Sequence, residues 1–201
     1  ACAPYRRLHL CHHNLETIET NNYESNNAKH NLLVDVCMAA KYEGDSIKTY
    51  YTGHQHKYDD SQLCTVLARS FADIGDIVRG RDIFRGNDEE KKQREQLDNN
   101  LKDIFAKIYE GLKTTKNGAQ TYYQDKSGGN FFKLREDWWD ANRAKVWYAM
   151  TCGAPEKAEY FRKTACGGGK SPTQGRCRCV TDVPTYFDYV PQFLRWFEEW
   201  A

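Results

Sequence analysis

The chain has 201 residues, enough for one domain or two small ones that bury well over half of their unfolded surface. Its 29 Lys and Arg balance 28 Asp and Glu, whereas a general nucleic-acid binder normally shows a clear basic excess. No apolar run approaches the roughly 20 residues that a membrane-spanning helix needs. We therefore expect no nucleic-acid partner and no membrane insertion of this chain. Because it opens at Ala1 without an initiator Met, we expect an excised fragment.

Two helices are predicted in the first 80 residues. The first covers residues 31–43 and should end at Gly44. Its apolar stripe consists of Leu32, Leu33, Val36, Cys37 and Ala40. The second covers residues 61–79, with Ser61 as its N-cap. The apolar positions that recur in it are Leu63, Leu67, Phe71, Ile74 and Val78.

The rest of the chain also favours helices. A third follows the acidic stretch 87–90, because negative charge suits a helix N-terminus. Its apolar positions are Leu97, Leu101, Ile104, Phe105, Ile108 and Leu112. A fourth helix is predicted over residues 134–151 and a short one over 155–164. Pro184 suits the first turn of a last helix, which Pro191 should kink or split.

Long polar connections join these helices. They cover residues 19–27, 44–60, 116–130 and 166–179, and the last is a Gly-rich loop bracketed by cysteines. We found no internal repeat and no heptad array in the sequence. The predicted fold class is all-α, a helical bundle with long disulfide-tied loops.

Eight cysteines are spread along the chain: Cys2, Cys11, Cys37, Cys64, Cys152, Cys166, Cys177 and Cys179. An even, dispersed set in a polar chain rich in Tyr and Trp favours disulfides and an oxidising compartment. The alternative, a zinc site, has two candidates, the C-x-C at residues 177–179 and the group 11–13. Neither has the ligand spacing that zinc sites usually show. We predict disulfides and no metal, without a choice of pairing.

Motifs for catalysis are weak. The stretch GGGKS at residues 167–171 lacks the first Gly of a phosphate-binding loop, because position 164 is Thr. Three carboxylates, Glu136, Asp137 and Asp140, suit the start of a helix better than an acid pair. The sequence contains no nucleophile elbow, zinc-protease motif or dinucleotide fingerprint. We therefore predict neither an enzyme nor a bound cofactor.

Basic residues gather in one stretch that could bind a sulfated glycan or a receptor. The candidate residues are Arg79, Arg81, Arg85, Lys91, Lys92 and Arg94. Smaller groups are the pair 6–7 and the two arginines that flank Cys177. The alternative is an ordinary solvated helix face, since exposed charge is the norm.

The stretch LREDWWDANRAKVWYAMTC, residues 134–152, raises a choice between core and binding surface. Its helical spacing puts Trp138, Trp139, Val146 and Met150 on one face, with Trp147 beside it. Trp and Arg are favoured in receptor contacts, so an exposed patch is the alternative. We predict structural core for Trp138, Trp139, Trp147, Trp196 and Trp200.

Four blocks in order carry a family resemblance. They are ACAPYRRLHLCHHNLE (1–16), CTVLARSFADIGDIVRGRDIF (64–84), LREDWWDANRAKVWYAMTC (134–152) and VPTYFDYVPQFLRWFEEWA (183–201). Together they resemble the Duffy-binding-like domain, alpha class, of the variant erythrocyte membrane protein family of Plasmodium falciparum. The resemblance runs through essentially the whole chain, with variable loops between the blocks.

The resemblance implies a cell-adhesion module on the extracellular face of the infected red-cell membrane, within a larger membrane-anchored protein. Implied partners are heparan sulfate-like glycans, complement receptor or blood-group sugars in cytoadhesion and rosetting. Host antibodies and adjacent domains of the same protein are further implied partners. The alternative is a structural and antigenic-variation spacer whose neighbouring domain carries the receptor affinity.

The resemblance also implies that residues 1–201 are a partial domain. Residues from about 1 to 60 would end a first subdomain, and about 61–201 would form the central helical subdomain and the start of the next. Cys2 and Cys11 would pair with cysteines upstream of this chain. An even number is then left for three internal bonds, among Cys37, Cys64, Cys152, Cys166, Cys177 and Cys179.

Overall fold

The computed structural model describes residues 2–53, 60–126 and 128–201. Over these ranges it contains helices and no strand, with an isolated bridge between Cys166 and Ser171. The elements are α1 (Tyr5–Leu8), α2 (His13–Glu16), η1 (Thr20–Asn22), α3 (Ala28–Gly53), α4 (Asp60–Arg79), α5 (Asp88–Thr115), α6 (Ala119–Tyr122), α7 (Phe132–Met150), η2 (Phe187–Tyr189) and α8 (Gln192–Trp200). The all-α fold class is confirmed.

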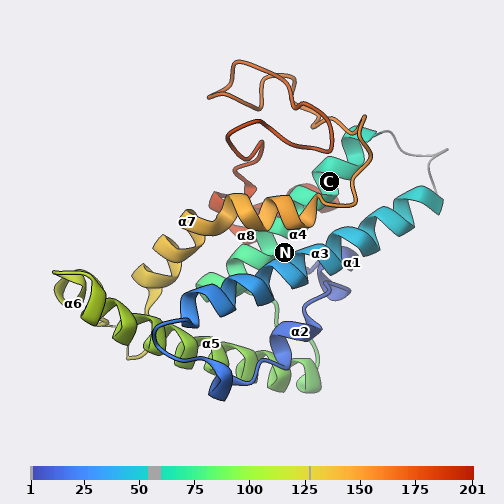
Figure 1. The fold of residues 1–201 in the computed structure, drawn as a ribbon. Helices are drawn as coiled ribbons and strands as arrows, with labels where there is room; N and C mark the ends of the chain where they lie inside the picture. Colours follow the sequence, from blue (N-terminus) through green and yellow to red (C-terminus); the bar gives the residue numbers. More distant parts are fainter. Residues whose placement is uncertain (1, 54–59, 127) are drawn as a thin grey trace.

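Helices α3, α4 and α7 pack around a shared core, and α5 lies along the side of it that faces away from α8 (Figure 1). α3 and α7 run in the same direction. The indole Nε1 of Trp138 donates to the carbonyl oxygen of Lys29 (3.3 Å) near their starts, and Gly44 lies against Met150 at the end of α7. No helix in the described ranges is both long enough and apolar enough to cross a membrane.

Gly44 lies inside α3, so the prediction that it ends the helix is wrong. A Cβ atom there would lie 2.0 Å from the carbonyl oxygen of Met150. The glycine is therefore required for the close approach of α7, and the helix continues past it to Gly53. The predicted connection 44–60 is thus largely helical, and its residues 54–59 lie outside the described ranges.

α4 begins at Asp60, so Ser61 lies inside the helix and the prediction that it caps the helix is wrong. A local signal does set the start of α5. Asn87 caps α5: its side-chain oxygen accepts from the backbone N–H of Glu90 (2.9 Å), whose carboxylate accepts from the N–H of Asn87 (2.7 Å). This capping box satisfies amide groups that the first turn would otherwise leave unpaired.

The tryptophans divide between core and surface. Trp138, Trp139, Trp147 and Trp196 are buried, and rings of Trp139 and Trp147 pack on Phe71 of α4. Trp200 is 56% exposed, so its assignment to the core is wrong. The physical reason is its position in the last turn of α8, whose inner face is already formed by Gln192, Arg195 and Trp196.

The segment after α7 is a folded loop, so the helix predicted over residues 155–164 is wrong. Two hydrogen bonds hold it to residues 173–177: Tyr160 N donates to the hydroxyl of Thr173 (3.0 Å), and Cys177 N donates to the carbonyl of Ala158 (2.8 Å). The last helix starts after Pro191, not near Pro184, because Pro191 occupies the N-cap of α8.

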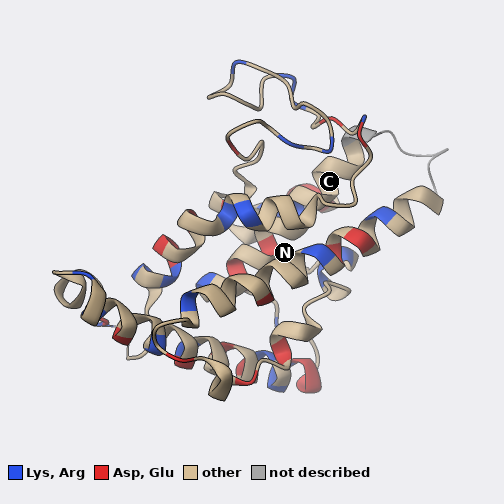
Figure 2. Ribbon diagram, viewed as in Figure 1, with Lys and Arg blue, Asp and Glu red and all other residues tan. Residues whose placement is uncertain are grey.

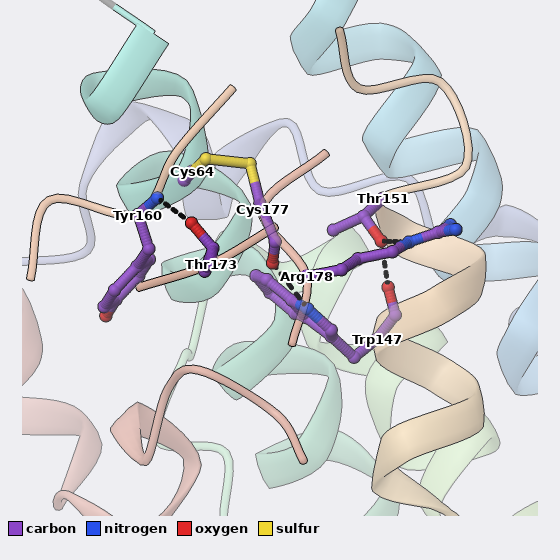
Figure 3. Close-up of a disulfide and its surroundings, with 7 residues drawn as sticks. All are labelled: Cys64, Trp147, Thr151, Tyr160, Thr173, Cys177 and Arg178. Atoms are coloured by element: carbon purple, nitrogen blue, oxygen red, sulfur yellow. Dashed lines mark hydrogen bonds between the residues drawn. A yellow bond between two sulfur atoms is a disulfide. The ribbon is translucent and has the colours of Figure 1, made fainter. Parts of the chain in front are cut away.

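Two disulfides form, Cys64–Cys177 and Cys166–Cys179. The first ties the C-terminal loop to α4, as Figure 3 shows, and the second closes the predicted Gly-rich loop. Cys177 and Cys179, the C-x-C of the zinc alternative, belong to different disulfides. Cys2, Cys11, Cys37 and Cys152 are free thiols.

The prediction of internal bonds for Cys37 and Cys152 is wrong. Cys37 lies beside Lys145 on the α3–α7 seam, whereas Gly153, next to Cys152, lies beside Asp45 and Lys48. Cys37 and Asp45 are eight residues apart in α3, about 12 Å along its axis at 1.5 Å per residue. A disulfide needs Cα atoms within about 7 Å, so the two thiols are too far apart to bond.

Candidate functional site

A cleft of about 690 Å³ opens between the loop 80–87, the first half of α5 and the N-terminal segment. A smaller cleft of about 270 Å³ continues it toward α1 and α2, and His12, Phe84 and Arg94 line both. We call the two clefts together the groove. It runs between elements that are far apart in the sequence. Its shape suits an extended polar ligand or a protruding loop of a partner.

Asp82 organises the floor of this groove. Its carboxylate accepts from Arg7 Nη2 (2.5 Å), lies 3.1 Å from Arg94 Nη2 and accepts from Gln192 Nε2 (2.7 Å). Both guanidinium groups also lie over the ring of Phe84, at 4.5 and 5.2 Å from its centroid. The ion pairs and ring contacts fix these side chains in place.

The structure brings three of the six predicted basic residues together, because Arg85, Lys91 and Arg94 all line the groove. Arg81 and Lys92 are exposed but lie outside its lining, and Arg81 Nε pairs with Glu136 (2.8 Å). Sequence spacing alone did not separate these two groups.

Arg79 is buried, so its assignment to a surface site is wrong. It is 1% exposed, and its side chain donates to the carbonyl of Gly75 (3.0 Å) and to the carboxylate of Asp76 (3.0 Å). It also donates to the carbonyl of Asp188 and lies over the ring of Trp139. Arg79 joins α4 to α7 and η2 and is out of reach of a ligand.

The charges that line the larger cleft cancel. The basic residues are Arg7, Arg85, Lys91 and Arg94, and the acidic residues are Asp82, Asp88, Glu95 and Asp98. A ligand in the cleft therefore meets four charges of each sign rather than a basic surface. This balance favours hydrogen bonding to a polar ligand over attraction of a highly charged anion.

His12 is a groove residue that the sequence reasoning missed. Its Nδ1 lies 2.8 Å from Glu16 Oε1. Burial lowers the pKa of His12, and the positive charge of Arg7 lowers it further. Together these effects outweigh Glu16, which would raise that pKa. The imidazole is therefore neutral at physiological pH and can form hydrogen bonds within the groove.

A buried ion network behind the groove was also missed. Arg195 of α8 donates to Asp73 (2.7 Å) and Asp76 (2.5 Å) of α4, and Arg6 pairs with Asp73 (2.7 Å). Burial would raise the pKa of Asp73, but Arg6 and Arg195 hold it below its usual value. Burial raises the pKa of Asp76 to about 6 despite Arg195 and Arg79. The sequence does hold a signal for this network: Asp73 and Asp76 lie three residues apart on an otherwise apolar face of α4.

A second buried cluster lies under α7. The carboxylate of Asp188 in η2 accepts from Arg143 (2.7 Å to each oxygen) and from the indole of Trp139 (2.9 Å). Arg143 also donates to the carbonyl of Thr185 (2.7 Å). These bonds hold the C-terminal segment on α7 and make the cluster structural.

The family model of the Duffy binding domain matches residues 1–195, nearly the whole chain. The chain belongs to the Duffy-binding domain family. Comparison with curated protein sequences finds no significant match. The helical bundle and its two disulfides are therefore those of a Duffy-binding-like domain.

Solved structures of Duffy-binding-like domains agree with this assignment. The chain is similar to the NTS-DBL1(alpha-1) domain of Plasmodium falciparum membrane protein 1 (PfEMP1) from the varO strain, with 45% identity, a TM-score of 0.80, and coverage of 100% of this chain and 43% of that one. The ICAM-1-binding PfEMP1 IT4var13 DBLbeta domain is 35% identical, with a TM-score of 0.73 over 97% of this chain and 41% of that one. A PfEMP1 DBLb domain bound to human ICAM-1 is 32% identical, with a TM-score of 0.72 over 97% and 38%.

The predicted resemblance to the alpha class is thus confirmed. The chain spans less than half the length of each of these three solved chains.

Proposed function

We propose that this Duffy-binding-like chain acts in cell adhesion, as part of a domain that binds receptors on host cells. The observation that carries the proposal is the likeness to DBLbeta domains that bind ICAM-1, at 35% and 32% identity over nearly the whole chain. The resemblance to the alpha class supports heparan sulfate-like glycans, complement receptor or blood-group sugars as ligands in cytoadhesion and rosetting. We assign the chain no catalytic activity.

The same proposal places the chain on the extracellular face of the infected red-cell membrane, within a larger membrane-anchored protein. The disulfides Cys64–Cys177 and Cys166–Cys179 suit an oxidising location. Host antibodies and the adjacent domains are its further partners. A solved relative from the varO strain carries a CIDR-gamma domain in the same chain as its DBL1-alpha domain, which supports an adjacent-domain partner.

We also propose that residues 1–201 are part of a larger domain. Residues from about 1 to 60 end its first subdomain, and about 61–201 form the central subdomain and start the next. The outer face of α8 supports this proposal because Phe193, Phe197 and Trp200 are all more than half exposed. An apolar surface of that kind is normally covered in a stable protein. Cys2 and Cys11 would pair outside these residues.

Receptor contact is assigned to the groove and its rim. Arg85 and Lys91 line the cleft with exposed side chains, whereas Arg94 is held by Asp82 and supports the floor. Arg81 and Lys92 lie beside the lining and add to the rim. The balanced charge of the cleft favours a protein receptor or a neutral sugar there.

The test measures binding of the folded chain to immobilised host receptors and to red cells. Two variants carry the same charge loss: Arg85→Ser with Lys91→Ser inside the cleft, and Lys41→Ser with Lys116→Ser away from both the cleft and its rim. We expect the first to weaken binding at least tenfold and the second to change it less than twofold. Equal binding by both variants would overturn the assignment of the groove.

The second candidate function is a structural and antigenic-variation spacer whose neighbouring domain binds the receptor. The presence of a second domain in the varO relative is the observation that favours it. Under this alternative the folded chain binds no host receptor, and its surface varies to escape antibodies.

A further inference from the structure

The connection between α5 and α6 contains the dipeptide Asn117–Gly118, which lies outside the groove. Of the twelve Asn residues in the chain, Asn117 alone is followed by Gly. Because Gly has no Cβ atom, the backbone nitrogen that follows this carboxamide is unhindered. Both residues are exposed. The dipeptide follows the end of α5, whereas the groove is lined by the first half of that helix (Figure 1).

The backbone at this dipeptide forms a tight turn with open space around it. Ala119 N donates to the carbonyl of Lys116 (3.2 Å), so Asn117 and Gly118 occupy the two central positions. Gly118 has φ +80° and ψ −6°. A Cβ atom placed on it would meet no atom within 4 Å. One backbone hydrogen bond therefore closes the turn, and nothing packs against this side of Gly118.

The two groups that can react with each other in this turn are unoccupied. Within the described ranges, neither the carboxamide of Asn117 nor the N–H of Gly118 forms a hydrogen bond. Asn99 is also exposed but lies inside α5, where the N–H of Asn100 donates within the helix. Helical dihedrals also fix the direction of that N–H. Asn117 is under neither restraint.

We propose that Asn117 is a site of spontaneous deamidation through a cyclic imide with the backbone of Gly118. The amide nitrogen of Gly118 loses its proton and attacks Cγ of Asn117, which forms a five-membered ring. The bond between Cγ and Nδ2 breaks, and Nδ2 takes up a proton and leaves as ammonia. Water then opens the ring at either carbonyl carbon and gives aspartate or isoaspartate at position 117. The attack is intramolecular, so no encounter between separate molecules is needed to form the ring.

The modification changes the charge of the surface around the turn. Residues 111–124 contain Lys113 and Lys116 and no acidic residue, a net charge of +2. Figure 2 shows this pattern: α5 bears blue and red segments, whereas α6 is tan. One new carboxylate at position 117 lowers the net charge of the stretch to +1, next to Lys116 in the sequence. Isoaspartate also adds a methylene group to the backbone and so lengthens the turn.

The test incubates the whole 201-residue chain, folded and with both disulfides intact, at body temperature and neutral pH. Peptide mass mapping follows each Asn, and an isoaspartyl methyltransferase labels isoaspartate. Digestion in heavy-oxygen water marks any product that forms during the digestion itself. Asn117→Gln removes the site, because its longer side chain would have to close a six-membered ring. The matched control, Asn99→Gln, changes an exposed Asn inside α5. Circular dichroism establishes that each variant is folded.

We expect Asn117 to deamidate at least about tenfold faster than Asn99, a difference of about 1.4 kcal/mol in activation free energy. Isoaspartate should be among the products. Asn117→Gln should abolish the fast reaction, and Asn99→Gln should leave it unchanged.

A smaller difference between the two rates would overturn the proposal. So would aspartate without isoaspartate, which indicates direct hydrolysis of the side chain, or a product that always carries heavy oxygen. The proposal does not rest on the adhesion function, so its failure leaves that function standing.

Discussion

At the residue scale, burial rather than residue type decides what the aromatic and basic side chains do. Trp139 is wholly buried against Phe71 and Gly75, whereas Trp200, in an equally apolar stretch, is mostly exposed. Helical spacing predicts the first because α7 has neighbours on its inner face. It fails for the second because α8 covers the core through a different face. The assignment of Arg79 to a surface site is wrong for a related reason. Its neighbours in the sequence are charged, but the face of α4 that carries it is buried.

The two tryptophans give a direct test of burial. We expect Trp139→Ala to lower the free energy of unfolding by about 3–5 kcal/mol through lost contacts and a cavity. Trp200→Ala should lower it by less than about 1 kcal/mol, because that ring is mainly in water. Urea unfolding followed by circular dichroism measures both. Similar losses in the two variants would contradict the assignment.

Gly44 gives a second test, with Gly53 as its control in the same helix. Gly44→Ala should destabilise the chain by at least about 1–3 kcal/mol, because the new methyl group meets the backbone of Met150. Gly53→Ala meets no atom within 4 Å and should be neutral or slightly stabilising. Thermal unfolding midpoints of the two variants measure this difference, and a neutral Gly44→Ala would show that α3 and α7 are not in close contact.

At the element scale, the helices were largely predictable and the segments between them were not. Apolar periodicity located α4, α5 and α7 to within a few residues, because each places one face on the core. The loop after α7 has no such period, and its form depends on disulfides and backbone pairing with residues far along the chain. The ion network that joins α4 to α8 also depends on contacts more than 100 residues apart.

The two disulfides should contribute unequally. Cys64–Cys177 closes a separation of 113 residues and Cys166–Cys179 one of 13. In the chain-entropy model, replacing the first pair by Ala should cost about 2 kcal/mol more than replacing the second. Equilibrium unfolding of the two double variants measures this difference in stability.

Alkylation of the denatured, unreduced chain is a separate control. It should modify Cys2, Cys11, Cys37 and Cys152, and fewer alkylated cysteines would contradict the pairing.

Asp76 should give the stability a recognisable pH dependence. Burial raises its folded-state pKa to about 6, whereas the unfolded carboxyl titrates near its ordinary value. Between about pH 4 and pH 6 the native state therefore binds more protons than the unfolded state. The contribution of Asp76 to stability must then fall as pH rises through this window.

Asp76→Asn removes this titration. We expect the difference in unfolding free energy, parent minus variant, to fall by up to about 3 kcal/mol from pH 4 to pH 7, since one pKa unit corresponds to about 1.4 kcal/mol. Urea titrations across that range measure the difference. A constant or rising difference would mean that Asp76 stays ionised in the folded state.

At the scale of the whole molecule, four ordered sequence blocks predicted the family, and the family model and solved relatives confirm it. The site was far less predictable, because a groove depends on which side chains α1, α2 and α5 bring together. Sequence order placed Arg85, Lys91 and Arg94 in one segment but gave no sign of Asp82 as their organiser or of His12 beside them.

Adhesion through this chain is the central claim, and a domain exchange tests it most directly. The chain would be exchanged between two parent proteins of different receptor preference while the neighbouring domain of each is kept. Binding of red cells and of purified receptors is then measured for both hybrids. The adhesion account predicts that receptor preference moves with this chain. Preference that stays with the neighbouring domain would contradict it and establish the chain as a spacer.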